Sequence, residues 1–234
     1  MRLFYTPNFS TQNNQLSESE SQHCLRVLRM KSGERIQVTD GKGKVFSGSI
    51  SILSKAVFLE VDEEQIVDNT RNYYLHLAIA PTKQIERLEW FLEKATEIGI
   101  DEISLIQTQN SERKRVRMDR LERILVSAMK QSKQYRLPKL NDLQSFSEFM
   151  NLDFSESQNW ISHCDGNFER QIIKNEDPKQ NICILIGPEG DFSPQEIEQA
   201  YQAKFRGLRL GDNRLRTETA GIVACQLIQS LHYD

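Results

Sequence analysis

Long apolar runs are missing from this sequence. Nowhere in its 234 residues does a stretch approach the roughly 18 consecutive apolar residues that a membrane-spanning helix requires. Residues 1–4 do not lead into the longer apolar segment of a secretory signal either. We therefore expect a cytoplasmic protein that makes no membrane contact.

Cysteine and histidine are scarce, with four residues of each. No Cys-x-x-Cys pair occurs, and a chain of this length does not depend on disulfide bridges. We interpret the cysteines as buried free thiols, with metal ligation as the alternative. The histidines have no metal-ligand spacing among themselves or with the cysteines, so we predict no metal site. The residues are Cys24, Cys164, Cys183 and Cys225, and His23, His76, His163 and His232.

The formal net charge is only −3, but the charges are unevenly distributed along the chain. Residues 113–139 hold ten Lys or Arg and two acidic residues, whereas residues 140–200 hold twelve Asp or Glu and three basic residues. Ten cations on one segment repel one another unless an anion binds, so we favour a polyanionic partner. A solvated helix face is the alternative interpretation.

The N-terminal part of the sequence is typical of a small β-rich domain. Two short alternating segments flank Asp40-Gly41-Lys42-Gly43, which predicts a β-hairpin. The polar residues that follow predict a linker, because strands alternate with helices beyond them. The expected elements are strands over residues 35–39, 45–50 and 56–61, a short helix that carries His23, Leu25, Val27 and Leu28, and a linker over residues 62–72.

The C-terminal part alternates strands with helices, which indicates an α/β fold with a mainly parallel sheet. One helix has apolar residues at helical spacing up to Gly99, a typical C-terminal stop, and we expect Pro138 to end the next. The expected elements are strands over residues 73–80, 103–106, 160–164, 182–186 and 205–210, and helices over residues 85–98 and 121–128.

A glycine-centred turn follows the fully apolar residues 182–186. This turn, Gly187-Pro188-Glu189-Gly190, precedes a helix start in which Ser193 can cap, Pro194 suits the first position and Glu196 completes a capping box. Ligands of open α/β sheets bind beyond the carboxyl ends of the strands. The segment therefore predicts one wall of a ligand site, with an ordinary strand-to-helix corner as the alternative.

A second corner of the same kind favours the ligand site. Leu210-Gly211 follows another strand, and Thr217-Glu218-Thr219 precedes an apolar helix. Neither corner matches Gly-x-Gly-x-x-Gly or Gly-x-x-x-x-Gly-Lys-Ser/Thr, which disfavours dinucleotide and P-loop phosphate sites. We expect the two corners to share a crevice that holds a nucleoside-like ligand through backbone groups and hydrophobic walls.

These corners carry a family resemblance. Residues 186–190 (Ile-Gly-Pro-Glu-Gly), Leu210-Gly211 and residues 215–220 (Leu-Arg-Thr-Glu-Thr-Ala) look like the signature of the RsmE family. Further segments are similar to that family, so the resemblance spans nearly the whole chain. They are His23 with Val27-Leu28-Arg29, residues 94–99 (Lys-Ala-Thr-Glu-Ile-Gly), and Gln131-Ser132 leading to Arg136 and Pro138.

The resemblance implies both a fold and an activity. It implies a SPOUT-class methyltransferase whose α/β domain, residues 71–234, is tied in a trefoil knot, with a small PUA-like β-barrel that binds RNA over residues 1–70. It also implies a homodimer, S-adenosylmethionine as methyl donor, and N3 of one uridine in 16S ribosomal RNA as acceptor. Two positions depart from the family pattern: Asp191 stands where a second glycine is usual, and Asn213-Arg214 replaces a basic residue followed by an apolar one.

The expected reaction suggests roles for individual residues. We expect Arg216 to stabilise negative charge on the uracil carbonyls or to bind a phosphate, and Arg136 is a second candidate for that role across a dimer. Glu189 is a candidate base; like Glu218, it has the alternative role of orienting its loop. The expected cofactor-binding residues are His163, Ile186, Gly187, Pro188, Gly190, Leu210, Gly211, Leu215 and Thr217, and the expected RNA-binding residues are His23, Arg26, Arg29, Arg113, Arg115 and Arg117.

Two other functions stay open at this point. The first is a noncatalytic, knotted RNA-binding factor in ribosome assembly. The departures from the family pattern at Asp191 and Asn213 leave this alternative open. The second is methylation of a different RNA nucleoside, because the lining of the pocket decides the acceptor. For the favoured function, the substrate is either free 16S ribosomal RNA or the small ribosomal subunit.

Overall fold

The computed structural model describes residues 1–11, 13–69, 71–173 and 181–232. The chain divides into two compact units. The first unit combines Met1–Thr70 with Val126–Leu137, and the second combines Arg71–Leu125 with Pro138–Asp234. The first unit thus contains a short segment that comes much later in the chain, and the helix α3 (Met118–Gln131) contributes residues to both units.

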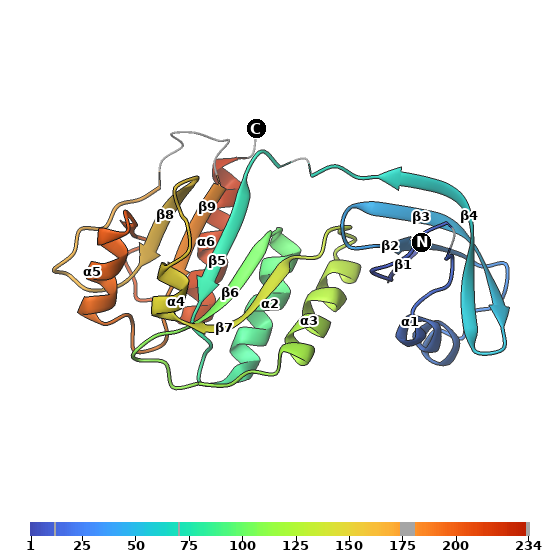
Figure 1. Ribbon diagram of the computed structural model, residues 1–234, viewed down its shortest axis with the longest axis horizontal. Coiled ribbons are helices and arrows are strands. Elements are labelled where there is room, and N and C mark those ends of the chain that lie inside the picture. The colour runs from blue at the N-terminus through green and yellow to red at the C-terminus, as the bar shows by residue number, and fades with distance from the viewer. Residues whose placement is uncertain (12, 70, 174–180, 233–234) are drawn as a thin grey trace. The chain divides into compact units, whose positions relative to one another are not determined.

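A four-stranded sheet in the order β1-β2-β3-β4 forms the first unit (Figure 1). Its antiparallel β2–β3 hairpin is the one predicted, and Gly41 and Gly43 of the turn adopt positive φ angles of 74° and 102°. The strand β1, which pairs in parallel with β2, was not predicted. The elements are β1 (Arg2–Tyr5), α1 (Glu18–Gln22), the π-helical turn η1 (His23–Val27), β2 (Arg35–Thr39), β3 (Lys44–Leu53) and β4 (Ala56–Ile66).

Two sequence predictions in the first unit were wrong. The predicted linker over residues 62–72 begins inside β4, whose last pair joins Ile66 to Lys44. The end of this strand is solvent-exposed, so it lacks the apolar alternation that identifies a strand from sequence. The helix α3 ends at Gln131, well before Pro138, because Lys133 turns into the left-handed region at φ 55°.

The chain after α3 returns to the hairpin of the first unit. The amide of Gly43 donates to the carbonyl of Tyr135 at 3.0 Å, and the amide of Leu137 donates to the carbonyl of Gly41 at 2.8 Å. The hydroxyl of Thr39 donates to the same Tyr135 carbonyl at 3.1 Å. These bonds explain why residues 126–137 belong to a unit built mostly from the N-terminus.

The second unit has a six-stranded sheet in the order β10-β8-β9-β5-β6-β7, and every strand pair in it is parallel. This confirms the α/β class with a mainly parallel sheet. The strand β7 and the helix α4 were not predicted. The elements are β5 (Tyr74–Ile79), α2 (Ile85–Ile98), β6 (Glu102–Gln107), β7 (Lys139–Ser145), α4 (Phe146–Met150), β8 (Ser157–Ser162), β9 (Asn181–Ile186), α5 (Pro194–Gln202), β10 (Arg206–Leu208) and α6 (Thr217–Leu231).

Helices cover both faces of this sheet (Figure 1). On one face, apolar residues of α4 and α5 pack with inward side chains such as Ile161 and Leu185. On the other face, α6 lies against α2 and contacts β5 and β9. Gly221 permits the close approach of α6, because a Cβ atom there would lie 2.6 Å from the buried ring of Phe91. None of the helices in the described part of the chain combines the length and the apolar character of a membrane span.

Candidate functional site

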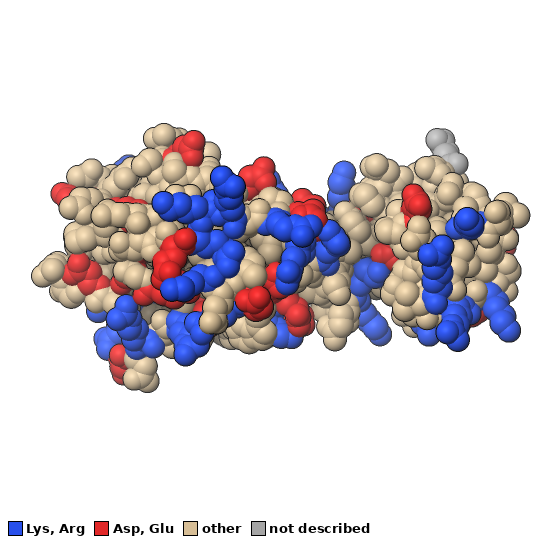
Figure 2. Space-filling view, turned by 90° about the horizontal axis from the view of Figure 1, so that it is seen from below, with Lys and Arg blue, Asp and Glu red and all other residues tan. Residues whose placement is uncertain are grey.

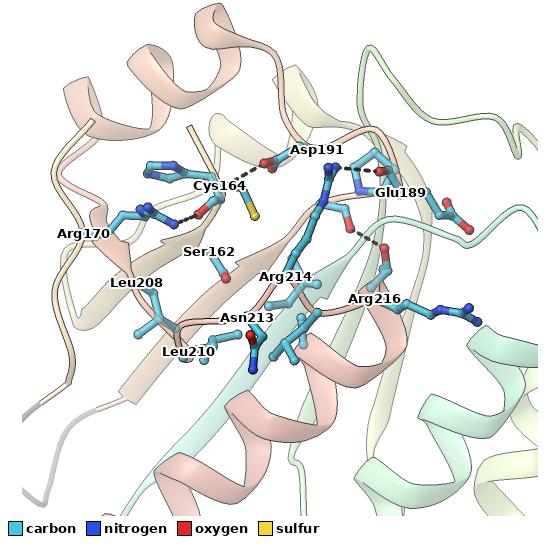
Figure 3. Close-up of a pocket in the computed structure, with 18 residues that line it drawn as sticks. Ser162, Cys164, Arg170, Glu189, Asp191, Leu208, Leu210, Asn213, Arg214 and Arg216 are labelled. Carbon is cyan, nitrogen blue, oxygen red and sulfur yellow. Dashed lines mark hydrogen bonds between the residues drawn. The ribbon is translucent and has the colours of Figure 1, made fainter. Parts of the chain in front are cut away.

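A cavity of about 270 Å³ lies at the carboxyl ends of three neighbouring strands of the second unit (Figure 3). The strand order places β8 between β10 and β9, so the segments that follow these strands lie side by side. This is the edge of a parallel α/β sheet where ligands bind. The lining residues are Ser162, His163, Cys164, Arg170, Ile186, Gly187, Pro188, Glu189, Asp191, Leu208, Leu210, Gly211, Asn213, Arg214, Leu215, Arg216, Thr217 and Ala220.

The first corner joins β9 to α5. The amide of Glu196 donates to the Ser193 hydroxyl, while the Glu196 carboxylate accepts from the Ser193 amide at 2.8 Å, which confirms the predicted capping box. Gly187 packs closely, since a Cβ atom there would lie 3.0 Å from the Phe192 ring, tighter than most Cβ contacts. The cap and the turn together hold the loop in a single shape beside the cavity.

The second corner joins β10 to α6, which begins at Thr217 with Arg216 as its N-cap. The Thr217 hydroxyl donates to the carbonyl oxygen of Gly187 at 3.0 Å, and both residues are buried. This hydrogen bond ties the start of α6 to the loop after β9. The two corners therefore share one crevice, as expected from the sequence.

Most of the expected cofactor residues line this cavity, and Gly190 is the exception. A Cβ atom on Gly190 would lie 3.0 Å from the Asn110 Cβ, and the Asn110 amide donates to the Gly190 carbonyl at 3.1 Å. Gly190 thus packs against the loop after β6. Its expected contact with a cofactor stays a prediction.

His163 lies one residue beyond the end of β8 and is almost fully buried. Its Nε2 lies 3.3 Å from the Tyr201 hydroxyl, and its backbone carbonyl accepts from Arg170 at 2.8 Å. Burial lowers the pKa of His163, although the negative charge of Asp191 opposes this shift. The imidazole is therefore neutral near pH 7 and forms a polar but uncharged part of the wall.

Glu189 is engaged by a backbone group. Its carboxylate accepts from the amide of Lys83 at 3.0 Å, which links the loop after β5 to the loop after β9. Its carbonyl oxygen accepts from Arg214 at 3.4 Å. Arg216 is exposed, and its side chain extends away from Leu208 and Leu210 (Figure 3).

The other expected functional residues are not among those that line this cavity. Arg136 belongs to the first unit, where it donates to the carbonyl of Val67 at 3.3 Å. His23, Arg26 and Arg29 also lie in that unit, on or just after η1. The expected roles of these residues stay predictions.

Two of the expected RNA-binding arginines in the loop before α3 have partners within the second unit. The guanidinium of Arg113 donates to the carbonyls of Thr82 and Lys83 at 2.9 and 2.6 Å, so it fixes the loop after β5. Arg117 pairs with Asp119 at 3.0 Å. Arg115 lines a shallow hollow together with Lys83 and Lys114.

The repulsion argument for the basic segment was partly wrong. Five of its cations form ion pairs with acidic residues of their own unit: Arg117 and Arg123 with Asp119 at 3.0 and 2.5 Å, Arg120 with Glu89 at 2.6 Å, Lys130 with Glu20 at 2.5 Å, and Lys139 with Glu102 at 2.8 Å. Sequence spacing missed three of these acids, Glu20, Glu89 and Glu102, because they lie outside the segment. Basic and acidic side chains are interspersed on the face shown in Figure 2.

Sequence reasoning missed several residues that line the cavity, among them Ser162, Cys164 and Arg170. Cys164 is exposed rather than buried, unlike the other three cysteines. Asp191 also lines the cavity, and its departure from the expected glycine was the one signal that could have drawn attention to it. Arg170 follows an irregular segment and had no such signal.

The lining suits S-adenosylmethionine. Leu208, Leu210 and Leu215 provide apolar walls, and Gly211 leaves room, because a Cβ atom there would project into open space. Arg170, Arg214 and Arg216 provide positive charge, and Glu189 and Asp191 provide negative charge, for a ligand with an amino-acid end. A nucleoside with a charged tail therefore fits both the shape and the chemistry.

Comparisons with known proteins agree with this site. An RNA methyltransferase domain family matches residues 69–229, and an RNA methyltransferase PUA domain family matches residues 16–61. A probable rRNA methyltransferase from Porphyromonas gingivalis is 41% identical, with a TM-score of 0.90 over 99% of this chain and 98% of that one.

Two further relatives carry more specific names. The ribosomal RNA small subunit methyltransferase E from Neisseria gonorrhoeae, solved with bound S-adenosylmethionine, is 28% identical, with a TM-score of 0.82 over 99% of this chain and 98% of that one. The enzyme of the same name from Buchnera aphidicola is 25% identical over 94% of this chain and 88% of its own length. The chain belongs to the RNA methyltransferase family, as its resemblance to the RsmE enzymes implied.

Proposed function

We propose that this protein transfers a methyl group from S-adenosylmethionine to N3 of one uridine in 16S ribosomal RNA. The observation that carries the proposal is the single cavity lined by both strand-to-helix corners. The names of the relatives support ribosomal RNA as substrate, and the Neisseria structure supports the methyl donor. The N3 position and the uridine come from the resemblance to the RsmE enzymes.

The cavity residues divide between the two ends of the cofactor. Backbone groups of Leu210, Gly211 and Leu215, with the apolar side chains around them, would hold the adenosine. Gly187 and Thr217 would position the methionine end, because their mutual hydrogen bond fixes both corners. Bound S-adenosylmethionine supplies an electrophilic methyl group, and this fixed pocket restricts its orientation.

The acceptor side requires a base and positive charge, because N3 of uracil is a good nucleophile only after it loses its proton. Glu189 is the candidate base, since the Lys83 amide holds its carboxylate in place at the edge of the pocket. Glu218, whose carboxylate lies 3.8 Å from Arg87, remains the alternative, with loop orientation open for both. Arg216 would stabilise the uracil oxygens or bind a phosphate, and Arg136 of a second subunit is the other candidate.

The rest of the molecule would deliver RNA to the pocket. We propose residues 1–70 as a PUA-like RNA-binding domain and residues 71–234 as a knotted SPOUT domain that forms a homodimer. Structured RNA is read mainly through its shape and its phosphates, and the target base is turned out into the pocket. The exposed Lys114 and Arg115 beside Lys83 are candidate phosphate contacts. With ribosomal RNA as substrate, the protein would act in the cytoplasm.

The direct test of the function is the nucleoside content of 16S ribosomal RNA from a strain that lacks the gene. Mass spectrometry should show the loss of N3-methyluridine at one position, restored by the wild-type gene. Loss of a different modified nucleoside would show a different acceptor. An unchanged RNA, together with no calorimetric response to millimolar S-adenosylmethionine, would favour the noncatalytic assembly factor.

The test of the active site is the substitution Arg216→Ala. We expect the variant to bind S-adenosylmethionine within about threefold of wild type and to lose at least about a hundredfold in turnover, because one charge-stabilising donor is typically worth that much. Arg209→Ala is the matched control, since Arg209 is exposed, pairs with Asp212 and does not line the cavity. Equal turnover of wild type and Arg216→Ala would remove Arg216 from the mechanism.

A further inference from the structure

Asp191 occupies a backbone conformation that favours glycine. Its φ angle is 64°, in the left-handed region, and its amide donates to the carbonyl of Pro188 at 2.9 Å to close the turn. Most side chains adopt this region only at an energetic cost, although Asp and Asn tolerate it better than others. Local interactions of the Asp191 side chain must therefore offset the cost of this backbone conformation.

The Asp191 carboxylate accepts two such hydrogen bonds from backbone amides. One carboxylate oxygen of Asp191 accepts from the amide of Cys164 at 2.7 Å, and the other accepts from the amide of Phe192 at 2.8 Å. The first bond joins the segment after β8 to the loop after β9, and Figure 3 shows it at the rim of the cavity. The carboxylate is thus held in a fixed position beside the pocket.

Within the described part of the chain, Asp191 has no ion-pair partner. Among the residues that the structure describes, no lysine or arginine forms an ion pair with it. Two pocket arginines direct their guanidinium groups to backbone carbonyls rather than to this carboxylate, although both keep their positive charge: Arg170 donates to the His163 carbonyl and Arg214 to the Glu189 carbonyl. A fixed carboxylate that lines a pocket and has no counter-ion favours a cationic ligand.

The other carboxylate of the pocket does not compete for this role. Glu189 accepts from the amide of Lys83, on the side of the loop that faces the segment after β5. Asp191 instead reaches toward Cys164, across the end of β8 (Figure 3). Of the two acidic residues that line the cavity, Asp191 is therefore the one whose carboxylate reaches the segment after β8.

We propose that Asp191 is a specificity-determining residue that makes the pocket prefer the positively charged sulfonium of S-adenosylmethionine over the neutral thioether of S-adenosylhomocysteine. This inference rests on the proposed function, since it assumes that S-adenosylmethionine is the ligand. The two molecules differ by one methyl group and one positive charge. Methyl transfer removes that charge. S-adenosylhomocysteine therefore lacks the attraction to the carboxylate, binds more weakly than the donor and inhibits the enzyme less.

The test is isothermal titration of both ligands into the full-length wild type and three variants. Asp191→Asn removes the charge at nearly constant shape, and we expect it to lower the ratio Kd(S-adenosylhomocysteine)/Kd(S-adenosylmethionine) about tenfold. Asp191→Gly removes the charge and relieves the backbone, and should lower the ratio similarly. Asp165→Asn is the matched control, since Asp165 is close in sequence but does not line the cavity, and should leave the ratio unchanged.

Each result has one meaning. An unchanged ratio in Asp191→Asn would overturn the proposal. This holds even if the affinities for both ligands fall by the same factor. Such a parallel fall would indicate only a lost hydrogen bond to Cys164, or a contact with a group that both ligands share. A lower ratio in Asp191→Gly alone would also overturn it. Melting curves of each variant exclude unfolding as the cause. Failure of the wild type to bind either ligand would instead refute the proposed function.

Discussion

The hydrogen bond from Thr217 to Gly187 offers a direct measure of how strongly the two corners depend on each other. Thr217→Val keeps the size of the side chain but removes the donor, and it leaves the buried Gly187 carbonyl without that partner. A buried acceptor left unsatisfied costs about 1–3 kcal/mol. We expect the free energy of unfolding of the second unit to fall by about 2 kcal/mol.

The measurement can be confined to the second unit. Both tryptophans, Trp90 and Trp160, belong to it, so urea unfolding followed by tryptophan fluorescence reports on this unit alone. The same loss should lower the melting temperature by about 4–8 °C, given about 2–4 °C per kcal/mol for a unit of this size. Binding of S-adenosylmethionine should weaken in parallel, because the two walls of its pocket are no longer tied together.

A matched substitution separates this effect from the general cost of valine in a helix. Thr219→Val lies two residues further along α6, where the threonine is half-exposed and does not line the cavity. We expect this control to stay within about 0.5 kcal/mol of wild type, the usual range for surface changes. If Thr217→Val is no less stable than Thr219→Val and binds the cofactor equally well, the hydrogen bond does not couple the corners and the reasoning is wrong.

Two further predictions concern the packing and the acid stability of the second unit. Gly221→Ala should destabilise the second unit by about 1–2 kcal/mol in the same urea assay, because overpacking against the buried ring of Phe91 outweighs the higher helix propensity of alanine. Gly166→Ala is the control and should be near neutral, because a Cβ atom there meets nothing within 4 Å. Equal stability of both variants would contradict the packing argument. Burial raises the pKa of Glu102, but hydrogen bonds from Lys139 and other donors outweigh it and hold the pKa at about 2, below the ordinary 4.5. The depressed pKa contributes stability that is present above about pH 4.5 and is lost as the pH falls toward 2. Wild type should therefore lose more stability than Glu102→Gln across that window. Parallel pH profiles of the two proteins would refute the stabilising role of the Glu102 carboxylate.

Local sequence signals identified the two corners because each signal is carried by neighbouring residues. The apolar run before Gly187, the Ser193–Glu196 capping box and the apolar face of α6 all act within a few positions of one another. Their physical causes, burial of a strand on both faces and satisfaction of free backbone amides, are equally local. The hairpin around Gly41 and the stop at Gly99 were predictable for the same reason.

The elements that the sequence did not reveal lack such local signals. The strand β7 has no fully buried residue along its length, so it shows no clear apolar pattern, and its place at the edge of the sheet is decided by pairing with β6. The segment over residues 126–137 joins the first unit through hydrogen bonds to residues far away in the chain. The basic segment looked unneutralised because three of its acidic partners, Glu20, Glu89 and Glu102, lie outside it.

The sequence alone determined the class of fold, the two corners and the residue types that can hold a nucleoside with a charged tail. Only the tertiary structure decided that β8 lies between β10 and β9, which makes the corners two walls of one cavity. It also decided that Arg113 fixes a neighbouring loop, and that Asp191 lines the pocket and forms no ion pair with the basic residues that the structure describes. Strand order and ion pairing depend on contacts between distant residues, and no local pattern of side chains specifies which distant residues will meet.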